Sequence, residues 1–294
     1  MSRKPIFVLI ALLACSLSFA QQQAVRGRST VPAVSAAENA AAAVAQKNMF
    51  ASISPAATSN CTWTFTSPQT AANKFLEFCV TVNGNITEFQ SPSGVEHIRV
   101  GGFGEGYGFC DGTAAGAVPY YDYADAGDSG NWQAPVTLAV TATSVKIART
   151  TSDGIWTLTQ TIAINKPAAS ANVTMALKNN TAVTRLATII RYADVDAGGV
   201  FGNNLDGTLD SAWGYDPIGS SAPYTGLLLQ VNGPNTFSHQ GWAINVPVGP
   251  NPCTPNANFV GTLTNTDGAI ISWNFFPSVA KNATKTIKLK YTEF

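Results

Sequence analysis

Residues 145–178 read VKIARTTSDGIWTLTQTIAINKPAASANVTMALK, and the pattern within them decides the fold class. Apolar and polar residues alternate over residues 156–164 and 173–177, so that one side of an extended chain is apolar. Asp153-Gly154 precedes the first of these runs and is typical of the tight turn of a β-hairpin. The stretch therefore predicts consecutive antiparallel strands that bury one face.

The same period of two recurs at Val136–Val140 and Lys285–Tyr291, and no stretch keeps the period of a helix. Roughly a dozen such runs, divided by Gly, Asn, Asp and Pro, follow residue 58. We therefore expect residues 59–294 to form an all-β domain, a large antiparallel β-sandwich, arranged as one sandwich or as two. Two turn-rich segments, 101–135 and 194–223, are expected to be its long loops.

Two stretches resemble the galactose-mutarotase-like supersandwich, a large β-sandwich used by several carbohydrate-active families. Residues 84–94, GNITEFQSPSG, look like its opening strand and turn, and residues 172–181, NVTMALKNNT, are similar to its central strands. Active members of that family use histidines together with a carboxylate that acts as a base. The resemblance therefore implies a supersandwich-like fold and, in an enzyme, His97 or His239 acting with Glu105 or Asp128.

The N-terminus has the features of an export signal. Arg3 and Lys4 precede a ten-residue apolar run, and small residues precede Gln21, which predicts a secretory signal peptide over residues 1–20. The run is too short to cross a bilayer, which takes about 20 apolar residues. We expect the chain to be secreted or extracytoplasmic, in the periplasm or at the cell surface, with no transmembrane segment after cleavage.

Two further features concern how the chain is held outside the cell. Residues 12–15, LLAC, resemble a bacterial lipoprotein box, in which Cys15 would carry a lipid anchor. Residues 21–58 are rich in Ala and lack an apolar stripe, so we expect a linker or stalk.

Four cysteines follow the predicted signal peptide, and an even number in an exported chain favours two disulfides. Cys61 and Cys79 lie symmetrically about a turn-like segment and could join one hairpin. A Cys79–Cys110 bond fits nearly as well, and Cys253 completes the set. The pairing stays open, whereas zinc is not indicated because no C-x-x-C spacing occurs.

Charge is scarce: only 12% of the residues are charged, and 17 basic residues balance 17 acidic ones. This excludes a polybasic nucleic-acid-binding protein and a coiled coil. Residues 100–145 and 192–280 contain no Lys or Arg but several acids. Carboxylates without neighbouring cations in the sequence face water, bind a cation or contact a hydroxyl-rich ligand.

The densest acidic group is threaded with glycines and includes Asp194, Asp196, Asp206 and Asp210. Hard oxygen ligands on a glycine-rich segment suit Ca²⁺, which takes six to eight oxygens. The spacing does not follow an EF-hand, and the alternative is that these side chains stabilise turns. Calcium is the one cofactor that the sequence suggests.

Aromatic residues beside carboxylates form a second group, typical of sugar recognition, in which rings stack on C–H faces and carboxylates accept hydroxyl hydrogens. Its members are Glu105, Tyr107, Tyr120, Tyr121, Tyr123, Asp125, Asp128 and Trp132, and a further platform is expected from Trp213, Tyr215 and Trp242. The alternative is that these rings anchor long loops to the core.

The sequence thus favours a secreted, disulfide-bonded β-sandwich that binds an extracellular ligand such as a glycan without catalysis. A carbohydrate-active enzyme of the supersandwich class and a structural surface protein are the alternatives. No complete catalytic set is apparent in the sequence.

Overall fold

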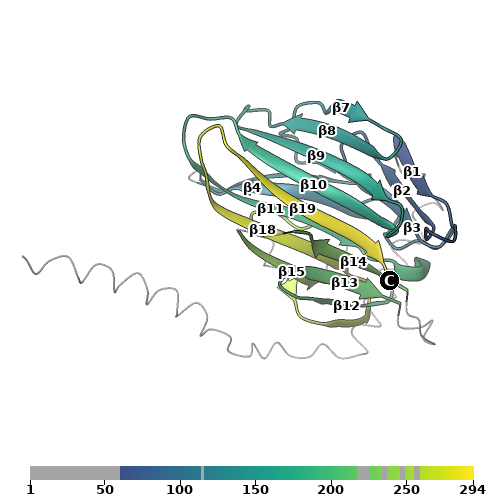
Figure 1. Cartoon of the computed structure of the whole chain (residues 1–294). Coiled ribbons are helices and arrows are strands. Elements are labelled where there is room, and N and C mark those ends of the chain that lie inside the picture. Colours follow the sequence, from purple (N-terminus) through teal and green to yellow (C-terminus); the bar gives the residue numbers. More distant parts are fainter. Residues whose placement is uncertain (1–59, 114–115, 217–224, 234–236, 246–248, 255–258) are drawn as a thin grey trace, which may run out of the picture. The chain divides into compact units, whose positions relative to one another are not determined.

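The computed structural model describes residues 60–113, 116–216, 225–233, 237–245, 249–254 and 259–294 (Figure 1). These residues form strands and one short 3-10 helix, η1 (Ala197–Gly199), which confirms the all-β class. The predicted signal peptide, the stalk and Cys15 lie outside the described residues. Within the described ranges, no helix is long and apolar enough to cross a membrane.

The strands form three sheets, and every pairing between strands is antiparallel. The small sheet consists of β1 (Trp63–Ser67), β2 (Leu76–Val80) and β3 (Ile86–Gln90). The nine-stranded sheet has, in spatial order, β17 (Leu263–Thr266), β12 (Asn203–Gly207), β13 (Ser211–Tyr215), β14 (Gly226–Val231), β19 (Thr284–Glu293), β10 (Ser170–Asn179), β9 (Trp156–Asn165), β8 (Ser144–Thr150) and β7 (Val136–Val140). The seven-stranded sheet has β16 (Phe259–Val260), β15 (Ser238–Ile244), β18 (Ala269–Val279), β11 (Arg185–Asp194), β4 (Glu105–Asp111), β5 (Val118–Tyr123) and β6 (Gly127–Asp128).

The two large sheets pack face to face and share one core (Figure 1). Ile162 of β9, Leu289 of β19 and Ile189 of β11 belong to the same buried cluster, and Phe78 and Phe89 of the small sheet join it. Because this core is continuous, the described part of residues 60–294 forms one sandwich and not two. In this respect the fold is the expected large antiparallel β-sandwich.

The alternating stretch behaves as predicted. Residues of β9 are buried at every second position from Trp156 to Ile164, and the turn before β9 places Gly154 at φ 73°. The left-handed backbone there explains why the sequence has glycine after Asp153.

The segments expected as loops, 101–135 and 194–223, contain strands, which corrects that prediction. β4 and β5 occupy the first and β12 and β13 the second. All seven residues of β4 are buried, because its two faces are both covered, so no alternation could mark it. Gly106 and Gly108 lie on the face of β4 that points away from the core, and a Cβ at Gly106 would collide with the ring of Tyr123.

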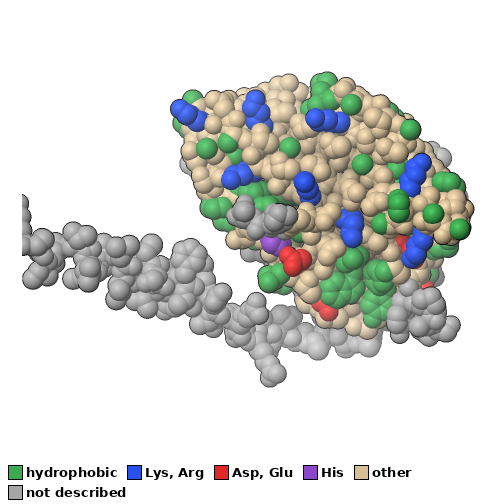
Figure 2. Space-filling model, in the orientation of Figure 1, with side chains coloured by type: hydrophobic (Ala, Val, Ile, Leu, Met, Phe, Trp, Pro, Cys, Tyr) green, Lys and Arg blue, Asp and Glu red, His purple; other side chains and the backbone are tan. Residues whose placement is uncertain are grey.

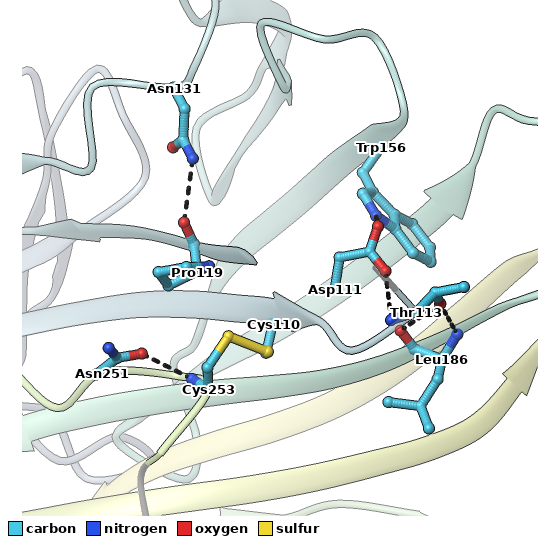
Figure 3. Close-up of a disulfide and its surroundings, with 9 residues drawn as sticks. All are labelled: Cys110, Asp111, Thr113, Pro119, Asn131, Trp156, Leu186, Asn251 and Cys253. Carbon is cyan, nitrogen blue, oxygen red and sulfur yellow. Dashed lines mark hydrogen bonds between the residues drawn. A yellow bond between two sulfur atoms is a disulfide. The ribbon is translucent and has the colours of Figure 1, made fainter. Parts of the chain in front are cut away.

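Two disulfides are present, Cys61–Cys79 and Cys110–Cys253, so the alternative bond between Cys79 and Cys110 is wrong. The first closes the edge of the small sheet. The second joins β4 to the segment that follows β15, where the N–H of Cys253 donates to Asn251 Oδ1 (Figure 3). That segment is thereby tied down across the outer side of the seven-stranded sheet.

The outer side of the nine-stranded sheet faces the reader in Figure 2, and Lys and Arg side chains are scattered over it with few acids. Exposed Lys146, Lys178 and Lys288 alternate there with threonines. This face of the molecule therefore exposes mainly basic and hydroxyl side chains.

Candidate functional site

The predicted ligand residue Glu105 lies between the two large sheets and is fully buried. It forms an ion pair with Arg191 of β11 and accepts hydrogen bonds from the Ile86 N–H (2.9 Å) and the Tyr291 hydroxyl (3.0 Å). The Glu105 carboxylate therefore contacts buried groups from β11, β19 and the start of β3.

Asp128 and its neighbour Asp122 also have partners. Arg149 of β8 forms ion pairs with both carboxylates, and Asp122 accepts further bonds from the amides of Asn83 and Asn85. The cations missing from residues 100–145 are thus supplied by strands that are distant in sequence. The absence of Lys and Arg from a segment did not indicate unpaired acids in these cases.

Three of the predicted aromatic residues pack in the core. Tyr107 is fully buried, Tyr120 is 2% exposed and Trp132 is 9% exposed, and their rings meet one another and Phe109. The hydroxyl of Tyr120 donates to Asp153 at 2.7 Å. Rings in these positions leave no open face for a sugar, and they anchor the chain as the alternative interpretation expects.

Tyr121 and Tyr123 point to the other side of β5, the outer face of the seven-stranded sheet, where their rings stack at 5.3 Å. Tyr121 is half-buried, whereas Tyr123 is covered and donates its hydroxyl to the Pro250 carbonyl. The segment containing Pro250 therefore shields Tyr123.

The outer face carries further aromatic rings on β15 and β18, and we call Trp242, Trp273 and Phe275 the aromatic platform. Trp242 pairs with Ile271 and Gln240 with Trp273 in the register of these strands, which places Trp242 diagonally next to Trp273. The Trp273 and Phe275 rings are parallel, with an angle of 2° between them. All three rings are partly exposed.

Between Ser272 and Phe275 the polarity of β18 is reversed relative to an ordinary sandwich strand, whereas Ile270 and Phe276 belong to the core. Ser272 and Asn274 face the interior and are buried, whereas Trp273 and Phe275 face outward. Asn274 donates within the interior to the Ile189 carbonyl. Partly exposed apolar rings above buried polar residues make this part of the outer face a candidate binding surface.

The predicted second platform is divided between the two sheets. Trp213 and Tyr215 share the outward face of β13 in the nine-stranded sheet, where Tyr215 accepts from Asn204 at 3.2 Å. Trp242 lies on β15 of the seven-stranded sheet. These three residues therefore do not form one surface.

A polar cavity of about 490 Å³ opens beside the small sheet. It is lined by amides, hydroxyls and carboxylates, which include Asn85, Asp122 and Asp125. The exposed Asp125 accepts two bonds from Asn60, through the backbone and the side chain. The cavity has the size of a sugar-binding site, but within its described lining the one aromatic ring, Tyr123, is covered.

The predicted calcium ligands separate into two groups. Asp194 and Asp196 lie together with Asp267, with one carboxylate oxygen from each within 4.8 Å of the others. Asp206 instead accepts from Thr262, and Asp210 contacts His239 at 2.6 Å. The set of four is corrected to a cluster of three, because the start of β18 brings Asp267 to the end of β11.

Burial and mutual repulsion act on this cluster. Burial, followed by the carboxylates of Asp196 and Asp267, raises the pKa of Asp194 well above its ordinary value. Burial and Asp267 raise the pKa of Asp196 to about 8. Arg99 lies at 3.4 Å from Asp194 and offsets part of this effect.

Neither histidine forms, with Glu105 or Asp128, the acid–base pair that an enzyme of the galactose-mutarotase-like class would need. His97 is fully buried and contacts the Ser91 carbonyl at 2.6 Å, and burial lowers its pKa. His239 contacts Asp210, whereas Glu105 and Asp128 contact arginines. The described contacts supply no histidine–carboxylate pair with Glu105 or Asp128.

Sequence reasoning missed Trp273, Phe275 and Asp267. The run Ile271-Ser-Trp-Asn-Phe275 alternates as clearly as β9 does, and it could have placed both rings on one face. Asp267 carried no such signal, because its proximity to Asp194 arises from the pairing of β11 with β18.

No family model and no curated protein matches the sequence. Among solved structures, the chain is similar to a bacterial glucoamylase complexed with acarbose, with a TM-score of 0.52, 10% identity, and coverage of 81% of this chain and 32% of that one. A polysaccharide lyase superposes with a TM-score of 0.45 and 13% identity over 76% of this chain and 33% of that one. A candidate aldose 1-epimerase from Escherichia coli K12 superposes with a TM-score of 0.43 and 8% identity, over 79% of this chain and 99% of that one.

The chain spans about a third of the length of the glucoamylase and of the lyase. At these identities the likeness shows the fold alone. The likeness to the glucoamylase is therefore one of fold, in line with the expected large β-sandwich.

Proposed function

We propose that this chain is an exported glycan-binding protein, which binds its ligand without catalysis on the aromatic platform of Trp242, Trp273 and Phe275. The observation that carries this proposal is the reversed polarity of β18, with its rings outward and its amide inward. Partly exposed rings on a rigid sheet can stack on the C–H faces of sugars, and they lose little conformational entropy on binding.

Polar groups beside the rings supply the hydrogen bonds that sugar hydroxyls require. Gln240 lies across from Trp273 on β15, and its side chain is partly exposed. The solved glucoamylase with a similar fold holds acarbose, which supports a carbohydrate ligand without identifying it. Two disulfides support a place outside the cytoplasm, where such bonds persist.

The way in which two of the acids are used supports a role without catalysis. Glu105 and Asp128 form ion pairs with arginines, and Glu105 is fully buried. The buried Glu105 carboxylate cannot reach a glycosidic bond.

Native electrophoresis through gels that contain single polysaccharides (starch, xylan, mannan, galactan and β-glucan) tests this proposal. We expect at least one polysaccharide to retard the wild type, and Trp273→Ala to weaken that binding about tenfold or more. Trp213→Ala is the matched control, because Trp213 is a partly exposed ring on the opposite sheet.

Two outcomes would contradict the proposal. The first is the absence of retardation in every gel. The second is retardation that Trp273→Ala leaves unchanged and that Trp213→Ala or Asn85→Ala removes, which would move the site to the other sheet or to the polar cavity. Release of reducing sugar by the wild type would contradict the non-catalytic part alone.

A further inference from the structure

The carboxylates of Asp194, Asp196 and Asp267 are held close together with few partners, and the first two residues are buried whereas Asp267 is partly buried. Asp194 is fully buried and Asp196 is 7% exposed. The Oδ1 atom of each of the three residues is buried and accepts no hydrogen bond from any described residue. Unpaired buried carboxylate oxygens at such short separations repel one another and are costly, so their arrangement requires compensation.

Two other buried side chains beside these carboxylates also have polar atoms without partners. Asn203 is fully buried, and its amide nitrogen donates to the carbonyls of Val195 (3.0 Å) and Val200 (2.7 Å), which leaves Oδ1 without a donor among the described residues. Because Val195 separates Asp194 from Asp196, the first of these bonds holds the Asn203 side chain against the backbone between two of the three acids.

Tyr192 provides the second such group. It lies two residues before Asp194 on the same face of β11, it is fully buried, and its hydroxyl has no partner among the described residues. Buried oxygens without a partner among the described residues thus occur at the end of β11, at the start of β12 and two residues before β18.

We infer that Asp194, Asp196 and Asp267 bind one Ca²⁺ ion, with Asn203 Oδ1 as a further ligand. All four donors are hard oxygens, and the set contains no sulfur and no imidazole, which favours Ca²⁺ or Mg²⁺ over zinc or copper. Oxygens bound to one Ca²⁺ at about 2.3–2.6 Å can lie up to roughly 5 Å apart, which matches the observed spread within 4.8 Å.

The local charge is consistent with a divalent ion. Three ionised carboxylates and the Arg99 guanidinium, at 3.4 Å from Asp194, sum to two negative charges. One divalent cation neutralises them. Mg²⁺ is disfavoured because it demands shorter bonds and keeps several of its waters, for which a buried group of protein oxygens leaves little room.

The site would fasten two strands of the seven-stranded sheet to β12. Asp194 ends β11, Asp267 precedes β18, and Asn203 begins β12 of the opposite sheet. We therefore expect the ion to stabilise the fold. This role is independent of glycan binding, since the platform lies farther along β15 and β18.

The test uses the full chain after treatment with EDTA and removal of the chelator. Isothermal titration with CaCl₂ measures binding, and thermal unfolding measures its effect on stability. We expect one Ca²⁺ per chain and a rise of several degrees in the unfolding temperature. Asp267→Asn and Asp196→Asn should each lose both effects.

Asp206→Asn is the matched control, because Asp206 is an acid on β12 that accepts hydrogen bonds from the Thr262 hydroxyl and from the N–H of the next residue, Gly207. It should retain full calcium binding. If one Asn variant does not fold, the other variant and the metal content of the wild type, purified without chelator and analysed by mass spectrometry, still decide the question.

Three results would overturn the inference. The first is the absence of heat and of any thermal shift with CaCl₂, as expected if the carboxyls share protons. The second is equal or tighter binding of MgCl₂, which would refute the assignment to calcium. The third is loss of calcium binding in Asp206→Asn together with its retention in Asp267→Asn.

Discussion

At the scale of single residues, the ion pair of Glu105 and Arg191 shows how this low-charge chain uses the charges it has. Both side chains are fully buried, and Arg191 also donates to Gln160 at 2.6 Å and to the Gly84 carbonyl at 3.2 Å. Each nitrogen of the guanidinium therefore has an acceptor, and the pair links the nine-stranded, seven-stranded and small sheets.

We expect Arg191→Met to lower the free energy of unfolding by about 3–5 kcal/mol, because Glu105 would remain buried without its cation. Adding Glu105→Gln should recover part of the loss. Urea denaturation measures both effects, and Lys178→Met, at an exposed position, serves as the control. If Arg191→Met were as harmless as Lys178→Met, the pair would have no structural role.

Asp153 gives a prediction about pH. Burial alone would raise its pKa, but hydrogen bonds from Thr151, the Ile155 N–H and the Tyr120 hydroxyl outweigh burial and hold the pKa below its ordinary value. A depressed pKa in the folded state means that the carboxylate contributes stability at neutral pH. This contribution is lost as the pH falls through that pKa.

We therefore expect Asp153→Asn to lower the free energy of unfolding by about 1 kcal/mol at pH 7. The difference between wild type and variant should stay constant down to about pH 5 and shrink below pH 4. Urea denaturation at a series of pH values measures it. A difference that grows on acidification would show that the sign is wrong.

At the scale of elements, the predictability of a strand depended on how many of its faces are buried. β9, β10 and β19 bury one face each, so their sequences alternate and could be identified. β4 and the C-terminal part of β11 are buried on both faces, and alternation vanishes there. For the same reason the pattern did not distinguish rings that are interior, such as Tyr107, from rings that face outward, such as Tyr121.

The two disulfides should differ in their effect on stability. Cys61–Cys79 spans 18 residues and Cys110–Cys253 spans 143. In the loop-entropy description these bonds contribute about 3 and about 5 kcal/mol. We expect Cys110→Ser/Cys253→Ser to lower the free energy of unfolding by about 2 kcal/mol more than Cys61→Ser/Cys79→Ser does. Equal losses in urea denaturation would contradict this prediction.

β7 is an edge strand with an apolar exposed surface: Val136 is 56% exposed, and Leu138 and Val140 are each 51% exposed. Such edges promote association between copies. We expect Val136→Lys to reduce concentration-dependent light scattering, with a change of less than about 0.5 kcal/mol in the free energy of unfolding. Val183→Lys, at an equally exposed valine in the turn between β10 and β11, should leave the scattering unchanged.

At the scale of the whole molecule, the partners of the acidic side chains come from strands that are distant in the sequence. The acids of residues 100–145 meet Arg149, Arg185 and Arg191 only because β4 and β5 pack against β8 and β11. The acids Asp194, Asp196 and Asp267 meet mainly one another and Arg99. The composition therefore suggested both a cation site and a sugar site. The fold determines which acids are already paired with arginines and which are available for one of these sites.

We expect a bound glycan to cover the outer face of the seven-stranded sheet. The oxidation rates of the chain's six tryptophans measure directly which faces are covered. Hydroxyl-radical footprinting, with and without the polysaccharide that retards the protein, measures the oxidation of each. We expect protection of Trp242 and Trp273, with unchanged rates at the partly exposed Trp63 and Trp213 and low rates throughout at the buried Trp132 and Trp156. Unchanged oxidation of Trp242 and Trp273 when the protein is saturated with ligand would contradict the claim.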